Sequence, residues 1–312
     1  MCVRGEVAVC LLLTLSTVLI SQIEEIVVAA ETFRVPRVNF AGERPLIQRP
    51  SWPTRVLITN DDGIDAPGLK ALVRGFSPTA EVIVVAPISN RSGSTSYASI
   101  LSRPVGVETR SMEGAQAAYG VDGYPADCVL IALTGLLVDE PPDLVVSGIN
   151  AGANMADAWA YSGTLGAARI AALHGIPAIA VSGGAPDALA AITNWVVRLV
   201  QTPAVRDLQP FQYLTVDAPD IPLSEIEGVS VVPRARGIVR FGARRSEEGG
   251  DGRQLWVLSG GSRQTAPPGT DVDVLANQRL AVTTMRADEQ DLVHLRQLQE
   301  RADELPAWEA LR

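Results

Sequence analysis

Short apolar runs alternate with amphipathic stretches along residues 55–216. The runs lie at 55–59, 81–86, 143–147, 177–182 and 213–216. Because their residues do not alternate between apolar and polar, they predict strands that are covered on both faces. Helical patterns separate them, one after Pro67 and others at 127–137, 164–174 and 186–201. This order predicts an α/β fold, a Rossmann-like doubly wound sheet that is mostly parallel.

Beyond residue 229 the pattern changes to short alternating runs between glycine-rich segments. These runs lie at 229–232, 254–258 and 280–284 and predict β-hairpins that either extend the sheet or reach a partner subunit. A charged helical pattern at 287–305 predicts a solvated terminal helix. We therefore divide the body of the chain into a core at 55–228, a β-rich extension at 229–286 and a C-terminal helix at 287–312.

The amino terminus carries a different kind of signal. An apolar run at 8–20 follows Arg4 and is followed by Val28-Ala29-Ala30, which is typical of a cleaved secretory signal and predicts export. The run is too short to span a bilayer alone. Glu24 and Glu25 interrupt the approach to the cleavage site, so a retained anchor, or a misassigned start and a cytoplasmic protein, stay open. Residues 31–54, rich in proline, predict a linker after a signal peptide at 1–30.

Composition narrows the possible chemistry. The chain has 312 residues, 47% of them hydrophobic, and a formal net charge of −9. This acidic balance argues against a protein that coats nucleic acid. Three cysteines and two histidines are too few for a disulfide scaffold, a multi-histidine metal site or a Ser-His-Asp hydrolase. Any hydrolysis must therefore use carboxylates, amides and hydroxyls.

Polar residues gather where the predicted strands end. The segments concerned are Asn60-Asp61-Asp62-Gly63, Asn90-Arg91-Ser92-Gly93-Ser94, the stretch 147–154 and Ser162-Gly163-Thr164. Ligands in open parallel sheets bind beyond the carboxyl ends of the strands, so we expect these segments to converge on one site.

Each of these segments allows two interpretations. Asp61 and Asp62 would repel each other unless a hard cation neutralises them, although Asp-Asp-Gly is also ordinary turn chemistry. Ser162-Gly163-Thr164 opens a helix, where free N–H groups can bind an anion or the serine can simply cap the helix. Asn150 and Asn154 offer amides to a metal ion or a phosphoryl group, or serve as turn residues.

Taken together, the segments resemble a known family. Thr-Asn-Asp-Asp-Gly-Ile-Asp-Ala-Pro-Gly at 59–68, the stretch 147–154 and Tyr-Ser-Gly-Thr at 161–164 are similar in order and spacing to the SurE survival-protein family. The resemblance implies a metal-dependent phosphomonoesterase that hydrolyses nucleoside 5′- or 3′-monophosphates. It further implies a homodimer or homotetramer joined through the C-terminal extension.

The resemblance also implies roles for individual residues. One divalent cation per subunit, Mg²⁺ or Mn²⁺, would be held by Asp61, Asp62, Ser92 and Asn150, with the two aspartates catalytic. The phosphate pocket would be lined by Asn60, Asn154, Ser162, Gly163 and Thr164.

Three departures from the family pattern bear on the substrate. Ile88-Ser89 stand where Asp-Arg is common, and Tyr124 stands where Thr is common. Thr215-Val216-Asp217-Ala218-Pro219 stand where the family has an Asn-x-Asn-x-Pro-like strand. They leave open a second hypothesis, a Rossmann-like module that binds a nucleotide or metal without turnover. A dinucleotide oxidoreductase is disfavoured, because carboxylates rather than a Gly-x-Gly-x-x-Gly turn follow the first strand.

Overall fold

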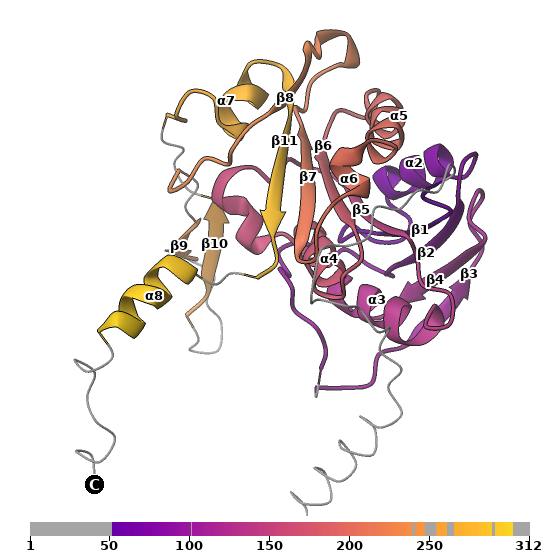
Figure 1. The fold of residues 1–312 in the computed structure, drawn as a ribbon. Coiled ribbons are helices and arrows are strands. Elements are labelled where there is room, and N and C mark those ends of the chain that lie inside the picture. Colours follow the sequence, from indigo (N-terminus) through magenta and orange to yellow (C-terminus); the bar gives the residue numbers. More distant parts are fainter. Residues whose placement is uncertain are drawn as a thin grey trace, which may run out of the picture.

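The computed structural model describes residues 52–100, 102–238, 241–246, 254–260, 265–288 and 291–301 (Figure 1). The predicted signal peptide at 1–30, most of the predicted linker and the last part of the predicted terminal helix lie outside these ranges. Export therefore stays a prediction. Within the described ranges, no helix combines the length and apolar character that a membrane crossing requires.

The main sheet has nine strands in the order β3-β4-β2-β1-β5-β6-β7-β11-β8. Neighbours from β4 to β7 are parallel, while β3 pairs antiparallel with β4 and β11 pairs antiparallel with β7. The strands are β1 Arg55–Thr59, β2 Glu81–Pro87, β3 Val107–Arg110, β4 Ala117–Val121, β5 Leu144–Asn150, β6 Ala178–Gly183, β7 Gln212–Ala218, β8 Gly228–Val231 and β11 Arg279–Arg286.

Helices cover both faces of this sheet (Figure 1). One face carries α2 (Pro67–Phe76), α5 (Leu189–Val200) and the short α6 (Pro203–Arg206). The other carries α3 (Pro125–Ile131), which continues as a π-helical turn at Ala132–Leu136, and α4 (Gly163–Leu173). The remaining helices are the 3₁₀ turns Ala156–Tyr161 and Leu223–Glu225, α7 (Asp271–Ala276) and α8 (Leu292–Glu300).

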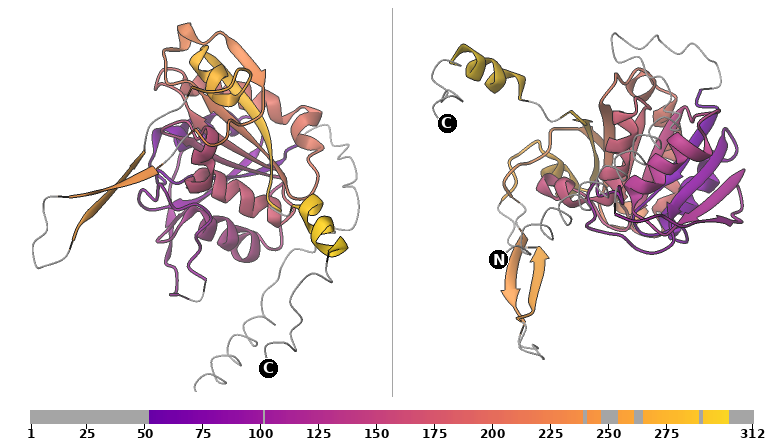
Figure 2. Two further views of the ribbon diagram at one scale, coloured as in Figure 1. Left: turned by 90° about the vertical axis from the view of Figure 1, so that its left-hand side faces the viewer. Right: turned by 90° about the horizontal axis from the view of Figure 1, so that it is seen from below.

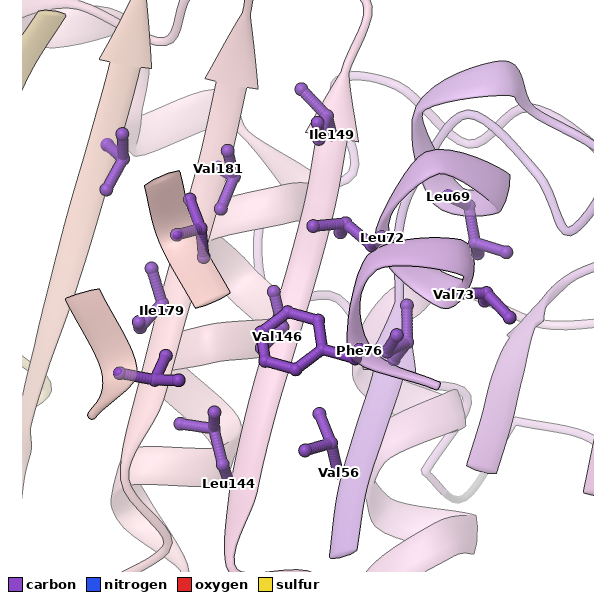
Figure 3. Close-up of a cluster of buried hydrophobic side chains, with 14 of the residues drawn as sticks. Val56, Leu69, Leu72, Val73, Phe76, Leu144, Val146, Ile149, Ile179 and Val181 are labelled. Atoms are coloured by element: carbon purple, nitrogen blue, oxygen red, sulfur yellow. The ribbon is translucent and has the colours of Figure 1, made fainter. Parts of the chain in front are cut away.

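The core follows from the alternation of side chains along each buried strand. Val56 and Ile58 of β1 pack on the α2 and α5 face, whereas Leu57 between them packs on the α3 and α4 face. Figure 3 shows the first of these layers, in which Leu72 and Phe76 of α2 lie against the sheet. Full burial of one such side chain contributes roughly 1.5–3 kcal/mol. Both faces of the strands are therefore committed to the core, and only their ends are available for chemistry.

The predicted fold class is confirmed. All five apolar runs form strands of the main sheet, and the three central helical patterns form α3 to α5. The pattern did not predict β3 and β4. β3 has four exposed residues and lies at the sheet edge, so no hydrophobic signal marks it.

In the C-terminal part, β8 and β11 extend the main sheet past residue 228, which is one of the two possibilities predicted for this region. The strands β9 (Phe241–Arg245) and β10 (Trp256–Gly260) instead form a separate antiparallel hairpin that projects from the body (Figure 2). At the other end, Trp52 is buried in the core, so the last residues of the predicted linker belong to the domain.

Candidate active site

The loop after β1 carries the two adjacent aspartates on a tight turn. Asn60 is fully buried, and its Nδ2 donates to the carbonyl of Gly63 at 2.9 Å. The Gly63 N–H donates back to Asn60 Oδ1 at 3.3 Å. Gly63 has a φ of +107°, which favours glycine. Both ends of the Asn60 amide thus hold the turn, and its contact with phosphate stays a prediction.

Asp61 lies at the centre of the contacts between the loops. Its side chain is buried, and Oδ1 accepts a hydrogen bond of 2.5 Å from Thr164 Oγ1 at the start of α4. Its carbonyl accepts from the N–H of Arg91 at 2.7 Å, which attaches the loop after β2. Burial raises the pKa of Asp61; the Thr164 hydrogen bond opposes this rise, and the nearby charge of Asp62 adds to it.

Asp62 connects two further loops. Its Oδ1 accepts a long hydrogen bond of 3.4 Å from Asn90 Nδ2, and its Oδ2 accepts from the N–H of Ala151 at 2.9 Å. Asn90 also accepts from the N–H of Ser92 at 2.9 Å. The loops that carry the predicted ligands Ser92 and Asn150 are therefore each one hydrogen-bond step from Asp62.

The two aspartates lack a basic partner in the described part of the chain, where no Lys, Arg or His forms an ion pair with Asp61 or Asp62. In the same part of the chain, no three His, Cys, Asp or Glu side chains gather closely enough to hold a metal ion. A cation here would therefore depend on two carboxylates and on neutral oxygens.

Asn150 and Ser92 can supply such oxygens. Asn150 Nδ2 donates to the carbonyl of Gly152 at 2.6 Å, and no hydrogen bond to Oδ1 is seen among the described residues. Asn150 ends β5, where the pairing with β6 shifts at Gly148. A Cβ on Gly148 would lie 2.2 Å from the carbonyl oxygen of Val181, so only glycine permits this approach. Ser92 is exposed on its loop.

The start of α4 lies directly against Asp61. Ser162 caps the helix by accepting from the N–H of Leu165 at 3.2 Å, which is the capping interpretation of this segment. A Cβ on Gly163 would lie 2.9 Å from Asp61 Oδ2 and 2.7 Å from Ser94 Oγ. Glycine therefore allows the helix N-terminus to approach the carboxylate, where a backbone hydrogen bond from Thr164 acts to lower the pKa of Asp61.

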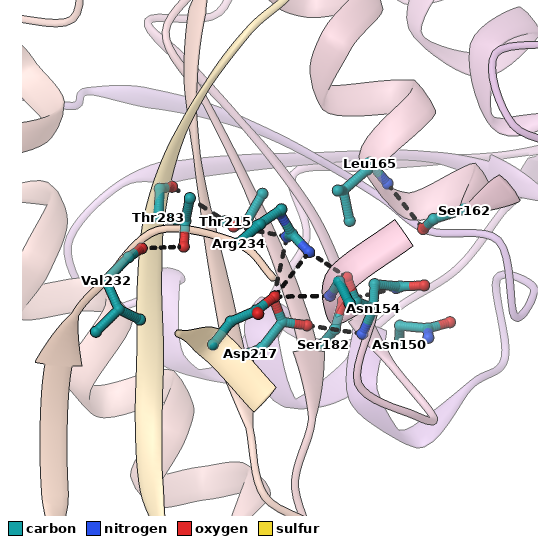
Figure 4. Close-up of polar contacts among 12 residues, drawn as sticks. Asn150, Asn154, Ser162, Leu165, Ser182, Thr215, Asp217, Val232, Arg234 and Thr283 are labelled. Atoms are coloured by element: carbon teal, nitrogen blue, oxygen red, sulfur yellow. Dashed lines mark hydrogen bonds and ion pairs between the residues drawn. The ribbon is translucent and has the colours of Figure 1, made fainter. Parts of the chain in front are cut away.

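Asn154 faces a different set of partners (Figure 4). Its Nδ2 donates to Ser182 Oγ at 2.9 Å, and its backbone N–H donates to Asp217 Oδ1 at 2.7 Å. Its carbonyl accepts from Arg234 Nη1. These bonds anchor the loop that follows Asn150, so Asn154 positions the loop in this structure, and its contact with phosphate stays a prediction.

An ion-pair network that the sequence did not predict lies against the loop that follows Asn150. Arg234, whose side chain is 6% exposed, lies 3.2 Å from Asp217 and 3.5 Å from Asp271. Asp271 also accepts from the N–H groups of Ala156 at 2.7 Å and Ala235 at 2.8 Å. Burial raises the pKa of Asp217, and the charge of Arg234 opposes that rise. The available sequence signal for this network was a position at the end of β7, and it indicated Asp217 but neither Arg234 nor Asp271.

Comparisons with known proteins identify the family of this chain. The family model described as survival protein SurE matches residues 56–240. A relative from Nitrosomonas eutropha called 5′-nucleotidase SurE is 38% identical over 245 residues, which cover 75% of this chain and 93% of that protein. The relative of the same name from Methylococcus capsulatus is 37% identical over 262 residues, covering 81% and 96%.

A solved structure gives the same result. The crystal structure of a SurE protein from Aquifex aeolicus has a TM-score of 0.67 and 27% sequence identity, covering 80% of this chain and 99% of that one. The resemblance drawn from the motifs is thereby confirmed.

Proposed function

The chain belongs to the SurE family, and from this premise we propose that it hydrolyses nucleoside 5′-monophosphates, and 3′-monophosphates as well, with one divalent cation. The predicted enzyme class, a 5′-nucleotidase, is confirmed by the family match and by relatives of that name. One observation carries the proposal for this chain: Asp61 and Asp62 are adjacent, lack any basic partner among the described residues, and are hydrogen-bonded to loops from β2, β5 and α4.

The donor set fits a hard cation. Two adjacent carboxylates, one of them buried, are electrostatically unfavourable without positive charge, as the raised pKa of Asp61 reflects. Carboxylate, amide and hydroxyl oxygens are the ligands that Mg²⁺ and Mn²⁺ prefer. Asp61, Asp62, Asn150 and Ser92 would hold the ion. When bound, the ion supplies positive charge that polarises a phosphoryl oxygen and favours ionisation of water.

The chain itself orients the reacting groups. Thr164 fixes the carboxylate of Asp61 through its hydroxyl, and Asn60 fixes the turn on which both aspartates lie. A phosphoryl group bound beside the aspartates would lie at the positive end of the α4 dipole, which favours its negative charge. Catalysis of this kind consists mainly of positioning and charge stabilisation.

The decisive experiment measures phosphate release from a panel of nucleoside 5′- and 3′-monophosphates with Mg²⁺, Mn²⁺ or a chelator. We expect turnover with a divalent ion, none with the chelator, and a fall in kcat of about 10²–10³-fold for Asp62→Asn. Asp65→Asn is the matched control, because Asp65 lies on the same loop but is exposed and pairs with Lys70 at 3.0 Å. Nucleotide binding without turnover would favour the non-catalytic alternative instead.

We propose further that the β9–β10 hairpin joins subunits of a homodimer or homotetramer. Leu255, Trp256 and Leu258 on this hairpin are exposed by 48%, 57% and 76%, and an isolated two-stranded hairpin is only marginally stable. Sedimentation velocity should show an oligomer that Trp256→Ser with Leu258→Ser dissociates. A native protein that sediments as a monomer would contradict this role.

A further inference from the structure

The two sides of the candidate site are unlike each other. On the β6 and β7 side, Asp217 and Arg234 form a buried charged network. On the other side of the aspartates lie the loops that follow β2 and β4. Because β4 is parallel to β2, residues 122–124 emerge at the same edge of the sheet as Ser92. This second side carries aromatic side chains.

Two tyrosines and an arginine form a cluster on those loops. The rings of Tyr97 and Tyr124 meet edge to face, with centroids 4.6 Å apart and planes at 75°. The guanidinium carbon of Arg91 lies 5.1 Å from the centre of the Tyr124 ring, and Arg91 Nη2 pairs with Asp122 at 3.1 Å. Tyr124 is thus held from two sides, while Tyr97 is 49% exposed.

A hydrogen bond and the side chain of Arg91 connect this cluster to the aspartates. The N–H of Arg91 donates to the carbonyl of Asp61 at 2.7 Å, and the next residue is the predicted ligand Ser92. The Tyr124 ring therefore lies one arginine side chain away from the backbone of Asp61. A group attached to a phosphoryl bound at the aspartates can extend toward these rings.

We propose that Tyr97, supported edge-on by Tyr124, is the surface on which the base of the nucleotide substrate stacks. This inference rests on the proposed function and deepens it, since it makes Tyr97 a specificity-determining residue. Every nucleobase has an aromatic face, so stacking discriminates weakly between bases. It discriminates strongly against phosphomonoesters that lack an aromatic ring, since these leave the tyrosine without a partner.

The test compares adenosine 5′-monophosphate with ribose 5-phosphate, which has the same ester and sugar but no base. For Tyr97→Ala we expect the KM for the nucleotide to rise about tenfold, which corresponds to ~1.4 kcal/mol. The kcat for the nucleotide and both constants for ribose 5-phosphate should change by less than about twofold, because no contact to the phosphoryl is lost. Tyr97→Phe keeps the ring and should behave as the native protein.

Two results would overturn the inference: an equal rise in KM for both substrates, which indicates a structural role, or no change for the nucleotide. If the native protein releases phosphate from neither compound, the proposed function fails, and calorimetric binding of adenosine decides the inference separately. Adenosine binding that Tyr97→Ala weakens and Tyr97→Phe preserves would still support stacking. Binding that neither variant changes, or no binding at all, would refute it.

Discussion

Two pairs of carboxylates lie at the same edge of the sheet. An arginine neutralises one pair, whereas the other has no basic partner among the described residues. Asp217 and Asp271 are buried and share Arg234, at 3.2 Å and 3.5 Å respectively. Asp61 and Asp62 have no basic side chain as a partner among the described residues; their hydrogen bonds come from a hydroxyl, an amide side chain and a backbone N–H. The first pair contains its own cation, and the second does not.

The comparison separates a structural cluster from a functional one. A buried acid pair with a fixed guanidinium and several N–H donors satisfies its charge within the fold. It ties β7 and α7 to the loop that carries Asn150, and therefore determines where that loop lies. An acid pair without a fixed cation, of which Asp62 is only partly buried, can take a diffusible ion.

Removal of the internal cation should have the largest effect. Arg234→Met leaves Asp217 and Asp271 buried without positive charge, and breaking a buried pair in this way costs about 3–5 kcal/mol. We expect the free energy of unfolding in urea to fall by that amount, or the variant not to fold. Arg234→Lys, which keeps the charge but loses the planar geometry, should fold with a smaller loss.

An exposed ion pair provides the control for this substitution. Arg286 pairs with Asp288 at 2.6 Å, but the arginine side chain is 56% exposed. Arg286→Met should therefore change the free energy of unfolding by less than about 1 kcal/mol. Equal losses for the buried and the exposed arginine would contradict the structural role assigned to Arg234.

The same comparison explains what the sequence could predict about the site. Asp61 and Asp62 closely follow a buried strand. A short segment of the sequence therefore predicts both the carboxylate pair and its position at the end of a strand. Arg234 and Asp271 meet only because β11 is inserted between β7 and β8, a tertiary arrangement that no local pattern encodes. Neither residue was singled out, since an arginine in an irregular segment is ordinarily solvated.

The two asparagines of the 147–154 stretch show most clearly what the sequence does not predict about the site. Asn150 and Asn154 have nearly the same Gly-Ala surroundings in the sequence, and both were assigned to the ligand site. In the structure Asn150 lies next to Ala151, which donates to Asp62, whereas Asn154 contacts Ser182 and Asp217. The direction in which each side chain leaves the loop depends on the packing of β6 and β7. Residue type alone therefore predicts the same amide chemistry at both positions but not the different partners that the fold gives them.

Binding of a cation by Asp61 and Asp62 should change the free energy of unfolding by less than the removal of Arg234 does. Mn²⁺ at about 100 times its dissociation constant stabilises a protein that binds it only when folded by roughly 2.7 kcal/mol. Burial raises the pKa of Asp61 above its unfolded value, so the metal-free fold loses stability as the pH rises through that interval. The ion requires the ionised carboxylate, so its stabilisation is full above the raised pKa and disappears as the pH falls below it.

The measurement is the thermal midpoint with and without MnCl₂ at about pH 7 and about pH 4, of which the lower is close to the unfolded pKa of about 3.9 for an aspartate. We expect MnCl₂ to raise the Tm at the higher pH and to change it little at the lower pH. In Asp61→Asn the rise should be smaller, and it should no longer depend on ionisation of this carboxylate. Arg234→Lys, if folded, should keep the gain, because its carboxylates already have a cation. A gain equal at both pH values and equal in Asp61→Asn would place the ion elsewhere and remove the contrast between the two acid pairs.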